Sequence, residues 1–296
     1  MNIIIITPVR NEEKYINFTI DSILSQTLLP TKWIIVDDGS QDNTGKIIQP
    51  FLKTAHFMEY IYIKNRGYRK PGSGVVEAFY DGFRRIENTD YEIVAKMDGD
   101  LEFGQDTLDR LVRAFADDPM LGIAGAPRYE QLGKLNSYRR VLVPKGYVGG
   151  PFKFYRRKCF KDIGGLIPRA GWDGVDIVRA KMNGWRAGEI ESLKIYHLKP
   201  TGTAKGEGLT QACEKYGDIS YFMGGYFWYF LLRAIGRSLV NRNARIGLFM
   251  IKGYYKSKRN KVERESPDFR AALKRIQQEN IIFWLKKLLK PSEQLV

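Results

Sequence analysis

The stretch Glu92-Ile93-Val94-Ala95-Lys96-Met97-Asp98-Gly99-Asp100 places two carboxylates, one residue apart, directly after a short apolar run. Residues 92–97 predict a buried β-strand, and the glycine between the two aspartates predicts a tight turn at its end. Carboxylates held together at a strand end can bind Mg²⁺ or Mn²⁺, which prefer oxygen ligands. Taken alone, Asp-Gly-Asp is more often an ordinary turn, so the rest of the chain decides between a turn and a metal site.

Outward from this stretch, toward the N-terminus, strand-like and helix-like segments alternate. The predicted strands are residues 3–7, 33–36 and 59–63, and the predicted helices are residues 12–26, 46–52 and 75–86. This alternation predicts an α/β fold with a mostly parallel sheet and helices on both faces. Because ligands bind at the carboxyl ends of the strands in such sheets, the residues directly after each strand form the candidate site.

Two more strand ends have polar motifs. The first predicted strand runs into Thr7-Pro8-Val9-Arg10-Asn11-Glu12, and the second ends in Asp37-Asp38-Gly39-Ser40. The first motif lacks the glycine pattern of a dinucleotide-binding turn, which argues against NAD and FAD. Acidic residues thus occur at both of these strand ends, and an apolar strand precedes Asp98-Gly99-Asp100. These observations favour a metal site over an ordinary turn at Asp98-Gly99-Asp100.

In order and spacing, four motifs resemble the family 2 glycosyltransferases, which have a GT-A fold. They are Thr7-Pro8-Val9-Arg10-Asn11-Glu12-Glu13, Ser22-Ile23-Leu24-Ser25-Gln26-Thr27, Val36-Asp37-Asp38-Gly39-Ser40 and Met97-Asp98-Gly99-Asp100. The resemblance covers about residues 1–200. It implies a domain that binds a nucleotide-sugar donor and a divalent metal ion.

The resemblance also implies roles for single residues. Thr7, Pro8, Arg10 and Glu12 are expected to border the nucleotide, Asp38 to bind the base, Asp98 to lie near the ribose and Asp100 to bind the metal. An aromatic residue is common at the position of Arg10, which either stacks on the base or pairs with a phosphate. A uracil ring N–H can donate to a fixed carboxylate such as Asp38, so a UDP-sugar is the favoured donor. The alternative is that Asp38 is a turn or helix-capping residue.

A second acidic cluster, Gly171-Trp172-Asp173-Gly174-Val175-Asp176, precedes a predicted helix at residues 177–182. The helix dipole favours carboxylates in a first turn whatever their function. The functional interpretation is a general base, because sugar transfer with inversion needs a carboxylate to take the proton of the attacking hydroxyl. The family usually has an acidic pair here, and Gly174 stands where the second acid often stands. Asp173 and Asp176 are therefore both candidates, with Asp173 preferred.

Basic residues near the predicted site are further candidates. Related enzymes often place a histidine at the position of His197 to complete the metal–diphosphate site, and a structural histidine is the alternative. Residues 66–74 form a basic, glycine-rich loop that ends at Gly74. Such loops offer cations and backbone N–H groups to phosphate, unless the loop is only solvated. The candidate diphosphate contacts are Lys199, Arg66, Arg69 and Lys70.

Composition limits the class of protein. The chain has 296 residues, of which 44% are hydrophobic and 27% charged, so wholesale disorder is excluded. Cys159 and Cys213 are its two cysteines, which excludes a disulfide framework and fits a reducing compartment. The apolar run at residues 3–6 is too short for a signal peptide. The net charge of +15 predicts an acidic partner.

This positive charge is concentrated in the last third of the chain. From Lys205 onward there are 18 Lys and Arg but 8 Asp and Glu, and no acidic residue lies between Ile219 and Val262. We therefore expect two domains, 1–203 and 204–296, the second being helical, basic and aromatic. The uncharged run at 219–232 is too short to span a bilayer. The cations after it favour peripheral contact with an anionic membrane, and the alternative is a helical pair packed on the body.

Together these observations predict an inverting glycosyltransferase that uses Mg²⁺ or Mn²⁺ and moves a sugar from a nucleotide diphosphate donor to a hydroxyl. We expect a lipid-linked or polysaccharide acceptor and a cytoplasmic location on the inner face of the cell membrane. One alternative is a sugar-phosphate nucleotidyltransferase, which needs a glycine-rich basic loop that the first strand end lacks. Another is a non-catalytic, membrane-tethered binding protein. Nucleic-acid binding does not account for acidic strand ends, which would repel phosphate.

Overall fold

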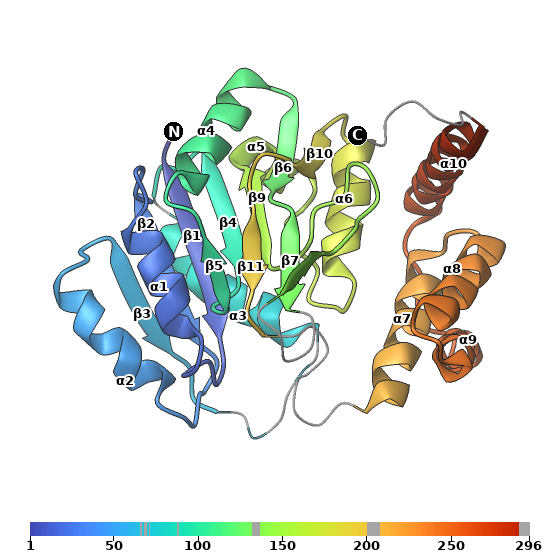
Figure 1. The fold of residues 1–296 in the computed structure, drawn as a ribbon, viewed down its shortest axis with the longest axis horizontal. Helices are drawn as coiled ribbons and strands as arrows, with labels where there is room; N and C mark the ends of the chain where they lie inside the picture. Colours follow the sequence, from blue (N-terminus) through green and yellow to red (C-terminus); the bar gives the residue numbers. More distant parts are fainter. Residues whose placement is uncertain are drawn as a thin grey trace. The chain divides into compact units, whose positions relative to one another are not determined.

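The chain divides into two compact units, Met1–Thr201 and Gly202–Val296. The computed structural model describes residues 1–65, 67, 70, 72–87, 89–131, 137–199 and 208–289. Figure 1 shows the first unit as an α/β body and the second as a group of helices.

A mixed sheet forms the centre of the body. In the described residues it has seven strands in the order β10-β6-β9-β4-β1-β2-β3 (Figure 1). They are β1 (Ile3–Val9), β2 (Lys32–Asp37), β3 (Met58–Tyr62), β4 (Ile93–Met97), β6 (Leu121–Gly125), β9 (Phe152–Arg156) and β10 (Arg186–Glu189). Strand β1 is parallel to β2 and β4, whereas β9 is antiparallel to β4 and β6. The mostly parallel sheet is as predicted, and β9 is an antiparallel strand that the sequence pattern did not reveal.

Helices cover both faces of this sheet because β1 is apolar on both sides. Side chains alternate along a strand, so a run of four isoleucines buries both faces. Ile3 and Ile5 share one core with helices α1 (Ile16–Leu24) and α4 (Thr107–Asp117). Ile4 and Ile6 share the other core with α3 (Gly74–Phe83), α5 (Arg157–Asp162) and α6 (Trp172–Met182). The predicted helix at 46–52 is α2 (Thr44–Ile48) followed by the 3₁₀ turn Gln49–Lys53.

A smaller sheet lies at the end of β4. Its strands are β5 (Leu101–Phe103), β11 (Ile195–His197), β7 (Arg128–Gln131) and β8 (Tyr138–Arg140), in the order β5-β11-β7-β8. The sequence pattern did not predict this sheet because strands of three or four residues show no clear alternation. Its register sets His197 opposite both Leu101 and Glu130.

The second unit contains α7 (Leu209–Met223), α8 (Phe227–Val240), α9 (Ala244–Arg259) and α10 (Pro267–Leu289). Helices α7 and α9 pack closely because Gly217 and Gly253 have no side chains. A Cβ on either glycine would lie 2.0 Å from a backbone oxygen of the other helix. Gly224, with a φ of +71°, ends α7, so the uncharged run at 219–232 is not one continuous helix. No helix in the described part of the chain has the length and apolar character needed to cross a bilayer.

Candidate active site

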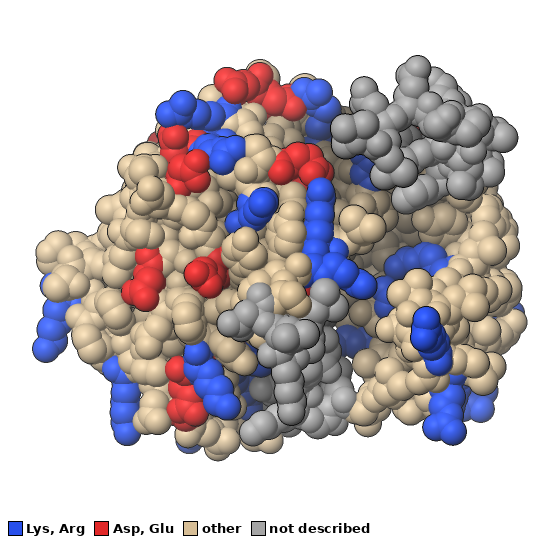
Figure 2. All heavy atoms as spheres, in the orientation of Figure 1, with Lys and Arg blue, Asp and Glu red and all other residues tan. Residues whose placement is uncertain are grey.

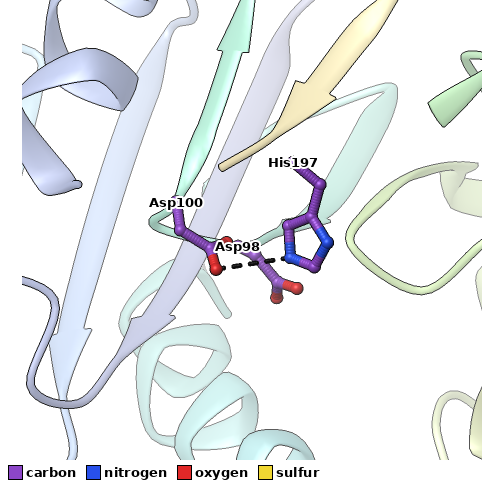
Figure 3. A group of neighbouring side chains, drawn as sticks. All are labelled: Asp98, Asp100 and His197. Carbon is purple, nitrogen blue, oxygen red and sulfur yellow. Dashed lines mark ion pairs between the residues drawn. The ribbon is translucent and has the colours of Figure 1, made fainter. Parts of the chain in front are cut away.

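Asp98, Asp100 and His197 come together at the carboxyl end of β4 (Figure 3). Ligand atoms from the three side chains lie within 4.8 Å of one another, and Nε2 of His197 is 3.3 Å from Oδ2 of Asp100. Two carboxylates and an imidazole suit a divalent ion such as Mn²⁺. The structure thus places the two predicted metal ligands, Asp100 and His197, in one cluster with Asp98.

Backbone contacts fix the Asp-Gly-Asp turn. The N–H of Asp98 donates to the carbonyl of Pro151 at 2.8 Å, and the N–H of Leu198 donates to the carbonyl of Asp100 at 2.9 Å. Gly99 must lack a side chain, because a Cβ there would lie 2.6 Å from a side chain at the end of β1. The turn is therefore hydrogen-bonded to the residue before β9 and to the residue after β11, and it packs against the end of β1.

A third carboxylate, that of Glu12, lies beside this cluster. Its Oε1 accepts a hydrogen bond from Nζ of Lys199 at 2.6 Å. In the described residues, Oε2 of Glu12 and Oδ1 of Asp100 are buried and have no hydrogen-bond partner. Such oxygens are rare, because burial removes their hydration without replacing it. A divalent cation would satisfy them, so the residues present fit a metal ion.

Burial and neighbouring charges shift the pKa values of three residues in the site. Burial, reinforced by Asp100, raises the pKa of Glu12 to about 7. Burial also raises the pKa of Asp98, with Lys96 opposing it. Burial alone would lower the pKa of His197, but hydrogen bonds to nearby carboxylates, chiefly Asp100, outweigh it and raise the pKa to about 9. Burial is therefore the largest cause at each of the three groups, and the neighbouring carboxylates add to it at Glu12 and outweigh it at His197.

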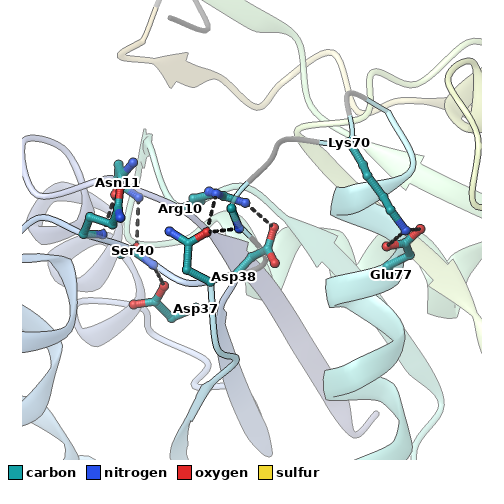
Figure 4. Close-up of polar contacts among 10 residues, drawn as sticks. Arg10, Asn11, Asp37, Asp38, Ser40, Lys70 and Glu77 are labelled. Atoms are coloured by element: carbon teal, nitrogen blue, oxygen red, sulfur yellow. Dashed lines mark hydrogen bonds and ion pairs between the residues drawn. The ribbon is translucent and has the colours of Figure 1, made fainter.

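Arg10 and Asp38, two candidate nucleotide-binding residues, contact each other. Nη1 of Arg10 lies 3.4 Å from Oδ2 of Asp38, and Nη2 donates to Oδ1 of Asn65 at 3.1 Å (Figure 4). The three residues follow β1, β2 and β3, whose parallel pairing brings their carboxyl ends to one edge of the sheet. Arg10 therefore orients the carboxylate of Asp38 in this structure.

Thr7 and Pro8 lie within β1. Thr7 is fully buried, and its hydroxyl accepts a hydrogen bond from Nε1 of Trp33 at 2.9 Å. Its side chain therefore supports the core, whereas Pro8 is half-buried.

Gly74 begins α3, and its N–H donates to the carbonyl of Lys70 at 2.8 Å. Nζ of Lys70 is 3.1 Å from Oε1 of Glu77 (Figure 4). Arg66 and Arg69, the other predicted diphosphate contacts of this loop, lie outside the described residues.

The two candidate bases lie on α6 in different surroundings. Asp176 is 1% exposed, and its carboxylate accepts hydrogen bonds from Nζ of Lys153 at 2.8 Å and from the hydroxyl of Tyr155 at 2.5 Å. Asp173 is half-buried, and its Oδ2 accepts from the hydroxyl of Tyr147 at 2.8 Å. Asp176 is thus enclosed in an ion pair, whereas Asp173 is accessible to a ligand.

Lys96, which was not among the predicted site residues, connects Asp173 to the metal cluster. It is buried on β4, pairs with Asp98 and donates to the carbonyl of Gly150 at 3.2 Å. A Cβ on Gly150 would lie 3.4 Å from the Cβ of Asp173. Asp98 and Asp173 are therefore separated by little more than Lys96 and Gly150. The sequence signal that could have identified Lys96 as a site residue is a lysine inside an otherwise apolar strand.

Residues 4–171 match the family model of glycosyl transferase family 2, and the chain belongs to this family. It is similar to the poly-β-1,6-N-acetyl-D-glucosamine synthase of Staphylococcus epidermidis, with 27% identity over 171 residues. That match covers 52% of this chain and 39% of the synthase, so the chain spans about two fifths of the relative's length. The family match sets the nucleotidyltransferase alternative aside.

Solved structures show the same fold at low sequence identity. Residues 1–349 of S. aureus TarS, in complex with UDP-GlcNAc, match 74% of this chain and 66% of that one, with a TM-score of 0.56 and 21% identity. The mannosyltransferase PcManGT from Pyrobaculum calidifontis, in complex with GDP-Man and Mn²⁺, is also similar. The match covers 98% of this chain and 88% of that one, with a TM-score of 0.54 and 15% identity. The predicted GT-A fold is confirmed.

Proposed function

We propose that the protein is an inverting glycosyltransferase that uses a divalent metal ion and a nucleoside diphosphate sugar, with a UDP-sugar as the favoured donor. The main observation is the convergence of Asp98, Asp100 and His197 at a strand end, in a chain of glycosyl transferase family 2. Structures of this fold in complex with UDP-GlcNAc, or with GDP-Man and Mn²⁺, support both the donor and the metal. A divalent cation bound by these three residues would offset the charge of the leaving diphosphate.

The neighbouring side chains would bind and orient the donor. Asp38, oriented by Arg10, would accept a hydrogen bond from the N–H of the base. Lys199, fixed by Glu12 beside the metal cluster, would contact the diphosphate. The ribose would lie between these two groups, near Asp98.

Asp173 is the proposed general base. A base must come within hydrogen-bonding distance of the proton it removes, and half-buried Asp173 meets this need better than Asp176, which is enclosed. Tyr147 donates to one carboxylate oxygen of Asp173 and so orients it. Lys153 donates to the carbonyl of Asp173 at 2.7 Å and also pairs with Asp176. Asp176 and Lys153 are therefore positioning residues in this proposal.

The proposed acceptor is a hydroxyl of a lipid-linked molecule or polysaccharide at the inner face of the cell membrane. A relative named as a poly-β-1,6-N-acetyl-D-glucosamine synthase supports a polysaccharide product. The basic side chains on the helical unit, visible in Figure 2, support an anionic membrane surface as partner.

A screen of nucleotide sugars tests the proposal. The purified chain is incubated with UDP-, GDP- and dTDP-sugars and Mn²⁺, and released nucleoside diphosphate is measured. We expect release from a UDP-sugar, and an α-linked donor should give a β-anomer of the product by NMR. Retained configuration would contradict inversion, and no release from any donor would favour the non-catalytic alternative.

A further inference from the structure

Helix α8 has one face that packs within the helical unit. Phe230 and Ala234 are buried and share a core with Ile246 and Met250 of α9. Phe230 also stacks on Tyr254 of α9, with ring centroids 5.0 Å apart. Part of the aromatic run at 219–232 is therefore used inside the unit.

Another face of α8 is apolar but exposed. Trp228, Leu232, Ile235 and Leu239 are 45%, 58%, 56% and 71% exposed. Their spacing of four, three and four residues places them in one row along the helix. We call this row the α8 stripe. Large apolar side chains in a continuous exposed row indicate an interaction surface rather than chance exposure.

Positive charge borders the α8 stripe. Arg242 and Arg245 follow the end of the helix, three and six residues beyond Leu239, and both arginines are exposed. No acidic residue occurs from Ile219 to Val262. Apolar side chains bordered by arginine complement a surface that is apolar inside and anionic outside.

We propose that the α8 stripe binds the surface of an anionic lipid bilayer. The helix would lie in the plane of the interface, because its 14 residues span only about 21 Å and a bilayer core is about 30 Å thick. The apolar row would enter the boundary between headgroups and acyl chains, and the arginines would contact headgroup phosphates. This deepens the proposed function by naming the membrane-binding element, but it does not depend on the sugar-transfer chemistry.

Charge favours a lipid surface over a second copy of the chain. A symmetric dimer through the α8 stripe would offer these arginines no acidic partner from the same stretch, which has none from Ile219 to Val262, whereas an anionic lipid surface would. Other cations of the unit are already engaged. Lys252 is 2.6 Å and Lys256 3.8 Å from carboxylate oxygens of Glu214. Arg242 and Arg245 are therefore expected to matter more than these two.

Vesicle sedimentation of the full chain tests the stripe. The parent should bind phosphatidylcholine vesicles that contain phosphatidylglycerol, and raising the salt from 0.1 M to 1 M should leave part of that binding, because apolar insertion is not screened. The triple variant Leu232→Gln, Ile235→Gln, Leu239→Gln should bind the vesicles with an affinity at least about tenfold lower at both salt concentrations. The matched control, Leu29→Gln with Leu142→Gln, changes exposed leucines of the body and should bind like the parent.

The arginines are tested separately. Arg242→Gln with Arg245→Gln should weaken binding at low salt by about tenfold, whereas Lys252→Gln with Lys256→Gln should weaken it less. Circular dichroism checks that the helices persist in each variant. Donor hydrolysis without vesicles should stay at the parent's rate, so failure here is distinguishable from failure of the proposed function.

Three results would overturn the proposal. The parent could fail to bind anionic vesicles, or the stripe variant could bind them like the parent. Alternatively, sedimentation velocity could show a dimer of the parent that becomes a monomer in the stripe variant, which would assign the stripe to self-association.

Discussion

Nε2 of His197 lies 3.3 Å from Oδ2 of Asp100, although His197 ends β11 and Asp100 precedes β5. On the other side of the ring, Nδ1 is 3.6 Å from Oε1 of Glu130. The imidazole is thus placed between two carboxylates, with Nε2 directed at the cluster. A carboxylate behind a metal-ligating histidine fixes the orientation of its ring. The register of the small sheet produces this arrangement.

Asp100→Asn should weaken Mn²⁺ binding by at least about tenfold, because the substitution removes a charged ligand from a buried site. Electron paramagnetic resonance of free Mn²⁺ measures the affinity. The matched control is Asp106→Asn, which changes a half-exposed aspartate that pairs with Arg110 on the surface. Equal affinities for the parent and the Asp100 variant would remove Asp100 from the metal site.

Metal binding should strengthen as the pH rises from 6.5 toward 9. The pKa of His197 is raised to about 9, so without metal the imidazole is protonated at neutral pH, and a cation must displace that proton. One displaced proton changes the apparent affinity by about tenfold per pH unit. Glu12, with a pKa of about 7, acts in the same direction. In His197→Gln the affinity should be lower and its pH dependence shallower, and an unchanged slope would contradict this role of His197.

Asp173→Asn should reduce kcat by about 10²–10⁴-fold while donor affinity stays near that of the parent, because a general base acts on the acceptor and not on the donor. Tyr147→Phe, which removes one hydrogen bond to Asp173, should have a smaller effect of the same kind. Steady-state kinetics separate kcat from donor KM. If Asp173→Asn instead raised KM and left kcat unchanged, Asp173 would be a binding residue.

Lys153→Met should destabilise the body by about 3–5 kcal/mol, because it leaves the buried carboxylate of Asp176 without its cation. Chemical denaturation measures the free energy of unfolding. Lys158→Met removes an exposed partner of Asp162 and should change stability little. Adding Asp176→Leu to Lys153→Met should recover part of the loss, and no recovery would show that the ion pair is not the cause.

Asp38→Ala should weaken nucleotide binding by a similar factor with Mn²⁺ and with chelator, because its proposed partner is the base and not the diphosphate. Calorimetry with UDP measures this, and Asp21→Ala, on the exposed side of α1, is the control. An affinity for UDP equal to that of the parent would reduce Asp38 to a turn residue that pairs with Arg10.

The central strands and the Asp-Gly-Asp turn could be predicted because their signals are local. Four consecutive isoleucines specify a buried strand, and the mainly apolar run Ile93–Met97 before two aspartates specifies a strand and its end. Neither signal depends on the rest of the fold. The same holds for the glycosyltransferase motifs, three of which lie at strand ends and one, residues 22–27, at the end of α1.

What could not be predicted depends on pairing between distant segments. The strands of the small sheet are too short to show alternation, so the position of Glu130 behind His197 had no sequence signal. The difference between Asp173 and Asp176 is likewise invisible in the sequence, since it depends on Lys153 and Tyr155 from β9. The sequence predicted a helix only over residues 177–182, whereas α6 begins at Trp172 and contains both acids.

The metal dependence of donor turnover tests the central claim most directly. Nucleoside diphosphate release from a UDP-sugar is measured for the parent after chelation with EDTA and again after Mn²⁺ is added back in excess. We predict that chelation abolishes release and that Mn²⁺ restores it in the parent but not in Asp100→Asn. Release that continues unchanged in EDTA, or that Mn²⁺ restores equally in both proteins, would contradict a metal site formed by Asp98, Asp100 and His197.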